Sequence, residues 1–173
     1  MAQTVAVNAM APFVLCSKLL HLMKSNKDSN NNDIDGIDDT NERSNSNDDN
    51  RYSHIVNVTA LEGKFNVGKK SSGHPHTNMS KAALNMITLT AARDYAREGV
   101  LMNSVDTGWV TDMSPHGLGA TSKAHEVWVG PPLDDEDGAA RVLDPVFDHV
   151  NTYTNNTKVQ FGNFYKDYYK ASW

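Results

Sequence analysis

The stretch Gly73-His74-Pro75-His76-Thr77-Asn78-Met79-Ser80-Lys81-Ala82-Ala83-Leu84 decides the fold of this chain of 173 residues. It predicts the start of a long helix over 75–98, because proline is favoured in a first turn and Gly99 follows as a stop signal. Thr77 and Lys81 lie four residues apart, so they share one face of that helix. The segment therefore predicts both a helix and the relative placement of two of its polar side chains.

Short strands are expected on both sides of this helix. Residues 54–59 form a run rich in β-branched side chains, and residues 100–105 form the next strand. Further along, residues 134–150 carry an acidic start and helical apolar spacing, and residues 159–165 suit a last strand. Strands that alternate with helices in this way are typical of a parallel sheet, so we expect an α/β fold.

The beginning of the chain changes character within fifty residues. Residues 2–24 carry apolar side chains at helical spacing, and Pro12 is expected to bend that helix near its middle. Residues 25–51 are dominated by Asn, Asp and Ser, with Ile34 and Ile37 as the only aliphatic residues. Such a tract cannot bury enough apolar surface to offset its ordering entropy. We therefore predict a disordered insertion over 25–51 within one domain of residues 1–173.

One part of the insertion has the spacing of a calcium-binding loop. Residues 31–42 place Asn, Asp, Asp, Gly and Glu at the expected positions. Against a calcium site, the first ligand is Asn31, Asp38 stands where a buried aliphatic residue is expected, and residues 43–50 cannot form the exiting helix. A chance match is the better interpretation in a tract so rich in Asp and Asn, and no metal site is predicted.

Bulk properties exclude several classes of function. A net charge of −5 gives no electrostatic basis for binding nucleic acid or an anionic membrane. Cys16 is the single cysteine, which excludes an intrachain disulfide and a thiolate metal cluster and suits a reducing compartment. We identify no secretory signal and no apolar run of membrane-spanning length. A soluble cytoplasmic protein with no membrane partner is expected.

Four segments resemble the short-chain dehydrogenase/reductase family and occur in the family's order. They match a helix with the catalytic asparagine, a strand ending in the catalytic serine, a helix starting with Tyr-x-x-x-Lys, and an Asn-x-Val-x-Pro-Gly turn; these are residues 7–13, 54–63, 73–84 and 102–110. The glycine-rich turn that holds a dinucleotide's pyrophosphate in such folds is missing. The resemblance thus implies the C-terminal half of a Rossmann-type doubly wound parallel sheet, with about three strands and flanking helices.

The resemblance also implies a set of catalytic positions. The family's asparagine corresponds to Asn8 and its lysine to Lys81. Its serine falls at Thr59 or Ala60, and its tyrosine at Thr77. In the family, tyrosine exchanges the proton at the carbonyl oxygen while hydride moves to or from the nicotinamide, serine steadies the oxygen, and lysine lowers the pKa of the tyrosine.

A cofactor is implied in the same way. Lys81 would hold the nicotinamide ribose, and Thr107, Gly108 and Val110 form the turn expected to touch the nicotinamide, with Thr107 in place of the family's proline. The cofactor would be NAD or NADP, and the substrate a small carbonyl compound or alcohol. Because the strand that discriminates the two cofactors is missing, the choice between them stays open. Binding by this chain alone is not expected.

The missing tyrosine leaves two functional hypotheses. A threonine hydroxyl has a pKa several units above the value of about 10 for tyrosine, so Thr77 cannot replace the phenol; His74 or His76 is the alternative proton donor. The chain is either part of a divergent oxidoreductase or an inactive remnant that serves as a binding or oligomerisation scaffold. Either form is expected to pair as a homodimer through the helices that contain Asn8 and Lys81.

Overall fold

The computed structural model describes residues 1–24, 52–68, 70, 72–110, 132–153 and 159–173. The predicted insertion over 25–51 and its calcium-like spacing lie outside these residues, as do residues 111–131, which follow the turn at Thr107-Gly108. The helices and strands within the described residues define the fold.

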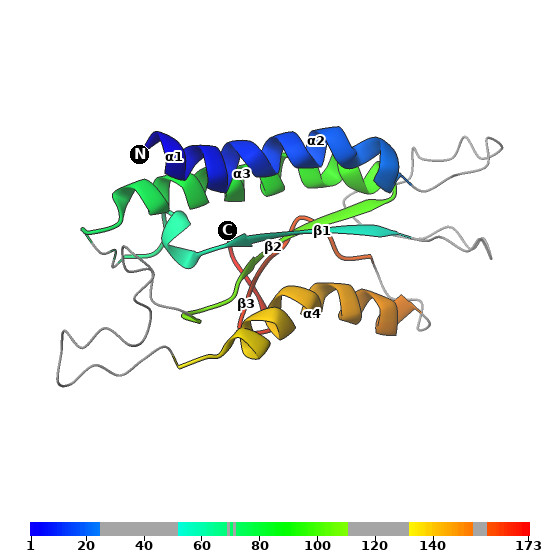
Figure 1. Ribbon diagram of the computed structural model, residues 1–173. Coiled ribbons are helices and arrows are strands. Elements are labelled where there is room, and N and C mark those ends of the chain that lie inside the picture. The colour runs from blue at the N-terminus through cyan, green and yellow to red at the C-terminus, as the bar shows by residue number, and fades with distance from the viewer. Residues whose placement is uncertain (25–51, 69, 71, 111–131, 154–158) are drawn as a thin grey trace.

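A four-stranded sheet forms the centre of the fold. Strands β1 (Ser53–Thr59), β2 (Val100–Asp106) and β3 (Phe164–Lys166) are parallel, and β4 (Tyr169–Ala171) pairs antiparallel with β3, giving the order β1-β2-β3-β4. Figure 1 shows helices α1 to α3 on one side of the sheet and α4 on the other. The expected α/β fold with three parallel strands is confirmed. The short β4 was not predicted.

The N-terminal helix consists of three consecutive segments. They are α1 (Ala2–Val5), the π-helical η1 (Ala6–Met10) and α2 (Ala11–Met23). Pro12 lies at the start of α2, directly after the π turn. Because proline lacks the N–H that an α-helix would use, a wider turn just before it relieves the mismatch that the sequence predicted as a bend.

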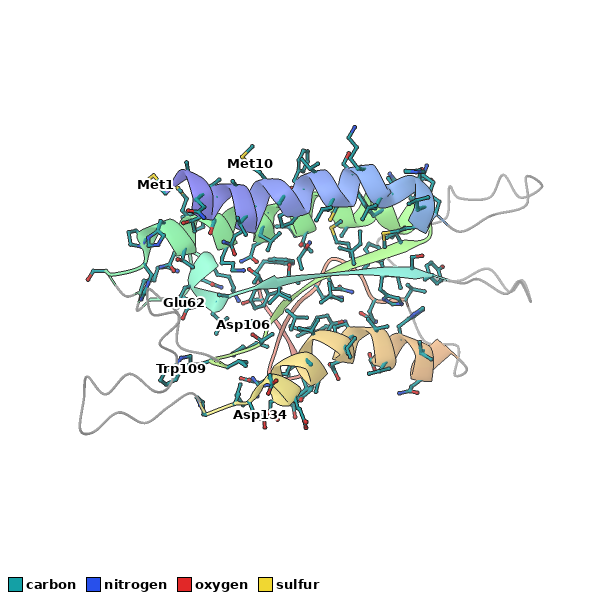
Figure 2. The ribbon with its side chains drawn as sticks, viewed as in Figure 1. Met1, Met10, Glu62, Asp106, Trp109 and Asp134 are labelled. Carbon is teal, nitrogen blue, oxygen red and sulfur yellow. The ribbon has the colours of Figure 1, made fainter. Side chains whose placement is uncertain are left out.

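The N-terminal helix is more apolar than we predicted from the sequence. By length and composition, Ala2–Met23 passes for a membrane-spanning segment, so the expectation that no apolar run is long enough is wrong. In the fold the helix packs along α3 and β1. Most of its surface is nevertheless uncovered, and Figure 2 shows Met10 pointing away from the sheet. Its exposed apolar side chains are Val7, Met10, Phe13, Val14, Leu15, Leu19 and Leu22.

Helix α3 (Pro75–Arg97) is fixed to the sheet by a buried polar network. The Thr88 hydroxyl oxygen accepts hydrogen bonds from Asn57 Nδ2 and Ser104 Oγ, each at 2.8 Å. The same hydroxyl lies 3.4 Å from the Leu84 carbonyl, to which it donates. Because the single donor and both acceptor sites of the hydroxyl are used, Thr88 aligns the helix with β1 and β2 at no cost in unpaired polar groups.

Two other helical segments complete the layers. The 3-10 helix η2 (Leu61–Gly63) follows β1 and packs so closely on α3 that a Cβ atom on Gly63 would lie 2.7 Å from the Lys81 carbonyl carbon. Helix α4 (Asp135–Tyr153) begins with a reciprocal cap, in which the Asp137 N–H donates to Asp134 Oδ1 at 2.8 Å and the Asp134 N–H donates to Asp137 Oδ2 at 3.4 Å.

A pair of histidines joins the start of β1 to the end of α4. His54 Nε2 and His149 Nδ1 are 3.1 Å apart, and the ring of Tyr52 packs edge-on against His149. Burial, together with the charge of His149, lowers the pKa of His54 from 6.5 to about 4. The folded chain therefore favours the neutral form of His54.

We expect the stability of the fold to decrease as pH falls from 6.5 towards 4. In that window the unfolded chain binds a proton at position 54 that the folded chain does not, and below about 4 both states are protonated. Because the ring is only partly buried, we expect a loss of about 1–2 kcal/mol rather than the full value of the shift. Urea unfolding across this pH range measures it. His54→Gln should flatten the profile, and His21→Gln, on the exposed surface of α2, should leave it unchanged.

Candidate functional site

Polar side chains gather at the carboxyl ends of β1 and β2. Figure 2 shows Glu62, Asp106 and Trp109 at this end of the sheet, with Asp134 nearby at the start of α4. In open α/β sheets, ligands bind in the crevice outside the carboxyl ends of the strands. We call this region the carboxyl edge and define it by Thr59, Asp106 and the turn at Thr107-Gly108.

Lys81 reaches the carboxyl edge from the second turn of α3. Its Nζ donates a hydrogen bond to the Val58 carbonyl at 2.8 Å. Burial lowers the pKa of Lys81, and the negative charge of Asp106 opposes that shift. Thr77 lies one turn earlier on the same helix and is half-buried. The predicted placement of Thr77 and Lys81 on one helix face is therefore present in the fold.

The hydroxyl of Thr59 points into the sheet–helix interface. Thr59 is only 5% exposed, and its Oγ1 donates to Asn85 Oδ1 at 2.5 Å, with the Lys81 carbonyl 3.5 Å away. Ala60, the other position that matches the family's serine, carries no hydroxyl. The observed contacts thus give Thr59 a structural role in holding β1 to α3.

Asn8 lies in the π turn of η1, a type of helical irregularity that is frequent at functional sites. Its Nδ2 donates to the Thr4 carbonyl at 3.1 Å, one turn back along the helix. The segment η1 packs against α3. Asn8 is therefore half-buried beside the helix that carries Lys81, with its amide engaged locally.

The turn after β2 is shaped by a glycine in a left-handed conformation. Gly108 has φ +81°, and a Cβ atom there would lie 2.8 Å from an Arg141 guanidinium nitrogen and 3.1 Å from Lys166 Nζ. The Thr107 carbonyl accepts a hydrogen bond from Arg141 at 3.0 Å. Val110 packs against Gly138 of α4. Close packing and backbone geometry both require glycine at position 108.

Asp106 connects the chain segments that meet at the carboxyl edge. It is 6% exposed at the end of β2. Its Oδ2 accepts the Leu61 N–H at 2.7 Å, its Oδ1 accepts the Gly108 N–H at 2.7 Å, and Lys166 Nζ lies 3.2 Å from Oδ1. One carboxylate thus fixes the segment after β1, the turn after β2 and the end of β3. The residue lies within the turn motif, but its role was not predicted; a lone acid ending an apolar strand is the signal that could have identified it.

Three lysine side chains interact with the carboxylate of Asp106. Lys64 is 7% exposed, its Nζ lies 4.7 Å from the centre of the Phe164 ring, and burial lowers its pKa while Asp106 opposes the shift. Lys81 and Lys166 bring two further ammonium groups to the same carboxylate. A cluster of ammonium groups suits an anionic ligand or an oxygen that gains negative charge during a reaction.

The two histidines that could donate a proton in place of the missing tyrosine lie at the start of α3. His74 precedes the first turn and is exposed, and His76 in the first turn is half-buried. Neither side chain has a described hydrogen bond to Lys81 or Asp106. Their part in any proton transfer stays a prediction.

The fold matches known carbonyl reductases. The NADPH-bound carbonyl reductase from chicken fatty liver superposes with a TM-score of 0.51 at 21% identity, and the carbonyl reductase Sniffer of D. melanogaster with 0.55 at 19%. Each comparison covers 95% of this chain but 53% of the reductase. The chain therefore has the fold of about half of a carbonyl reductase of the short-chain dehydrogenase/reductase type.

Sequence comparisons add little beyond that fold. No family model matches the chain. An uncharacterized protein of Acanthamoeba polyphaga mimivirus, R665, is 28% identical over 106 residues, which cover 58% of this chain and 22% of that protein. The matched residues thus span a minor part of this relative.

Asp106→Asn should destabilise the fold by about 2–4 kcal/mol, because an amide has one acceptor oxygen and cannot accept both the Leu61 and the Gly108 N–H as the buried carboxylate does. Asp94→Asn is a matched control on the surface of α3. Asp94 pairs with Arg97 at 2.8 Å, and its side chain is 77% exposed. Its loss should cost less than about 0.5 kcal/mol. Urea unfolding of both variants at neutral pH makes the comparison, and equal losses would contradict the role given to Asp106.

Proposed function

We propose that this chain is the catalytic-side half of an NAD(P)-dependent short-chain oxidoreductase for small carbonyl compounds or alcohols, and that it does not transfer hydride by itself. The likeness to two carbonyl reductases, one of them bound to NADPH, supports the oxidoreductase assignment at the level of the fold. The observation that carries the proposal is the placement of Lys81 beside Asp106 at the carboxyl edge, where a nicotinamide ribose would lie.

The residues of the carboxyl edge fit part of a cofactor site. Lys81 would hold the nicotinamide ribose, and the turn at Thr107, Gly108 and Val110 would face the nicotinamide. A bound nicotinamide cofactor would supply or accept the hydride. The described residues include no glycine-rich βα turn for a pyrophosphate, so the other end of the cofactor must be held by another part of a complete domain.

The residues of the site are poorly suited to proton transfer. Thr77 has no acidic phenol, and the Thr59 hydroxyl donates to Asn85 rather than projecting from the edge. Lys81 can stabilise negative charge on a substrate oxygen, but it does not replace the proton donor that the family's tyrosine provides. These features support a proposal of inactivity for the chain alone.

We expect the recombinant chain to show no micromolar binding of NADPH in isothermal titration calorimetry. Micromolar binding needs about −8 kcal/mol, and the pyrophosphate contacts that would contribute much of it are missing. Thr77→Tyr should not restore carbonyl-dependent oxidation of NADPH, since a proton donor cannot support the reaction when no cofactor is bound. Saturable micromolar binding with turnover by the unmodified chain would refute the proposed inactivity.

A specific observation favours a second function, that of a homodimeric scaffold. The N-terminal helix and α3 carry exposed apolar side chains, with Val7 62% and Met86 57% exposed. Met10, Val14 and Leu89 extend the same surface. Large exposed apolar surfaces mark protein–protein contacts, so we propose pairing through these helices.

If the helices pair, light scattering after size exclusion should give about twice the mass of 19.1 kDa for the chain. Met86→Asp combined with Leu89→Asp should yield the monomer, because like charges would then face each other in a symmetric contact. Phe147→Asp on α4 is the control and should leave the mass unchanged. A wild-type monomer at high micromolar concentration would contradict the scaffold.

A further inference from the structure

We propose that the carboxyl edge binds a carbonyl compound that also carries a carboxylate group, and that the ammonium group of Lys64 holds this carboxylate. The substrates would then be keto acids or the corresponding hydroxy acids. The substrate class rests on the proposed function, but the carboxylate site itself does not. Lys64 lies between the segments 54–63 and 73–84, so the family resemblance assigns no role to it.

The ammonium group of Lys64 is buried without an oxygen partner. The residue is 7% exposed, and its Nζ lies 4.7 Å from the centre of the Phe164 ring, which is 1% exposed. In the part of the chain that the structure describes, Nζ forms no hydrogen bond and no ion pair. An aromatic ring attracts a cation but does not replace the oxygen atoms that an ammonium group binds in water. Within the described residues, the three N–H donors of Lys64 therefore remain for a ligand.

The other cationic groups of this region have oxygen partners. Lys166 pairs with Asp106 at 3.2 Å, and Arg141 pairs with Asp167 at 2.6 Å. Lys81 Nζ donates to a main-chain carbonyl at 2.8 Å. One ammonium group without such a partner matches one negative charge, so a carboxylate fits this position better than a doubly charged phosphate group, which needs several cations or backbone donors.

The carboxylate of Asp106 does not satisfy Lys64. Its two oxygens accept the N–H groups of Leu61 and Gly108, and Lys166 forms the close ion pair. Burial lowers the pKa of Lys64, and the more distant charge of Asp106 opposes this effect without cancelling it. The charged form of Lys64 is thus less stable than in water. A carboxylate bound to Nζ would offset this loss through charge-assisted hydrogen bonds.

The backbone at Lys64 is held in place before any ligand binds. The Lys64 N–H donates to the Leu61 carbonyl at 2.9 Å, and Lys70 Nζ donates to the Lys64 carbonyl. Gly63 packs so closely on α3 that a Cβ atom would lie 2.7 Å from a main-chain atom of that helix. A donor on a fixed backbone loses less conformational entropy on binding than one on a mobile loop.

The charge of the whole chain does not favour anions. Its net charge is −5, so a carboxylate must be attracted by a local group. Glu62, two residues before Lys64, is exposed and forms no ion pair with it in the described structure. Specific binding of a small carboxylate at the carboxyl edge would therefore report on Lys64.

Lys64 and Lys81 would divide the recognition of a keto acid. Both ammonium groups interact with the charge of Asp106, so both lie near one carboxylate of the protein. Lys81 would stabilise the carbonyl oxygen, and Lys64 would bind the acid group. The carbonyl carbon would receive a hydride from a bound nicotinamide cofactor and the oxygen a proton from solvent, so that the keto acid becomes a hydroxy acid.

Amide chemical shifts measured by NMR test the carboxylate site in the recombinant chain of 173 residues. The chain is titrated at constant ionic strength with pyruvate and levulinate, which are keto acids with different spacing, and with acetone and inorganic phosphate. At least one keto acid should shift the amides of residues 61–65 in a saturable way. Its Kd should be at least about tenfold lower than the Kd of acetone or phosphate. Acetone has three carbons like pyruvate but lacks the carboxylate.

Two variants assign the effect to Lys64. Lys64→Met keeps an unbranched side chain without the charge, and it should weaken the binding of the keto acid at least about tenfold. Lys18→Met, on the exposed surface of α2, should leave the Kd unchanged. Circular dichroism checks that both variants fold. If Lys64→Met does not fold, the comparison of keto acids with acetone in the unmodified chain decides.

Several results would overturn the proposal. They are shifts that do not saturate, binding of acetone or phosphate as tight as that of both keto acids, or unchanged binding by a folded Lys64→Met variant. The protein isolated from its own cells separates this inference from the proposed function. Binding of a keto acid without NADPH oxidation would refute the proposed catalysis and leave the carboxylate site intact. Oxidation of NADPH with equal kcat/KM for acetone and for both keto acids would keep the catalysis and overturn the substrate class.

Discussion

The buried carboxylate of Asp106 is the interaction on which the rest of the carboxyl edge depends. It accepts backbone N–H groups from Leu61 and Gly108 and pairs with Lys166, so three segments far apart in the sequence are held at one point. A buried negative charge is stable only when such partners surround it. Its charge also opposes the lowering of the pKa of Lys64 and of Lys81 by burial. The backbone geometry and the electrostatics of the carboxyl edge therefore both depend on Asp106.

Local patterns in the sequence predicted the helices and the first two strands, because such patterns depend only on neighbouring residues, whereas the strand expected over 159–165 is shorter and lies at Phe164–Lys166. The proline start and glycine stop place α3 within one residue of its observed end, and the β-branched run places β1. Asp106 was not recognised, since its partners at Lys166 and Leu61 are brought near it only by the sheet. The contact between His54 and His149 is equally nonlocal. The N-terminal helix was predicted over residues 2–24, close to its observed extent, but the sequence reasoning missed that it is apolar enough to pass for a membrane-spanning segment.

In the candidate site, too, the local features could be predicted from the sequence and the nonlocal features could not. The placement of Thr77 and Lys81 on one helix face follows from helical spacing alone. The direction of the Thr59 hydroxyl does not, because strand alternation and the partner at Asn85 determine it. A scaffold close to that of carbonyl reductases thus holds a lysine and an ordered turn, while its hydroxyl groups are either engaged or of the wrong acidity.

Residue-resolved amide exchange at Leu61 and Gly108 tests the role of Asp106 most directly. Both N–H groups lie outside the strands, yet the buried carboxylate accepts them. They should therefore exchange at least about 100-fold more slowly than the amide of Phe65, whose side chain is 95% exposed in the segment after η2. Exchange at Leu61 and Gly108 as fast as at Phe65 would mean that Asp106 does not hold the carboxyl edge together.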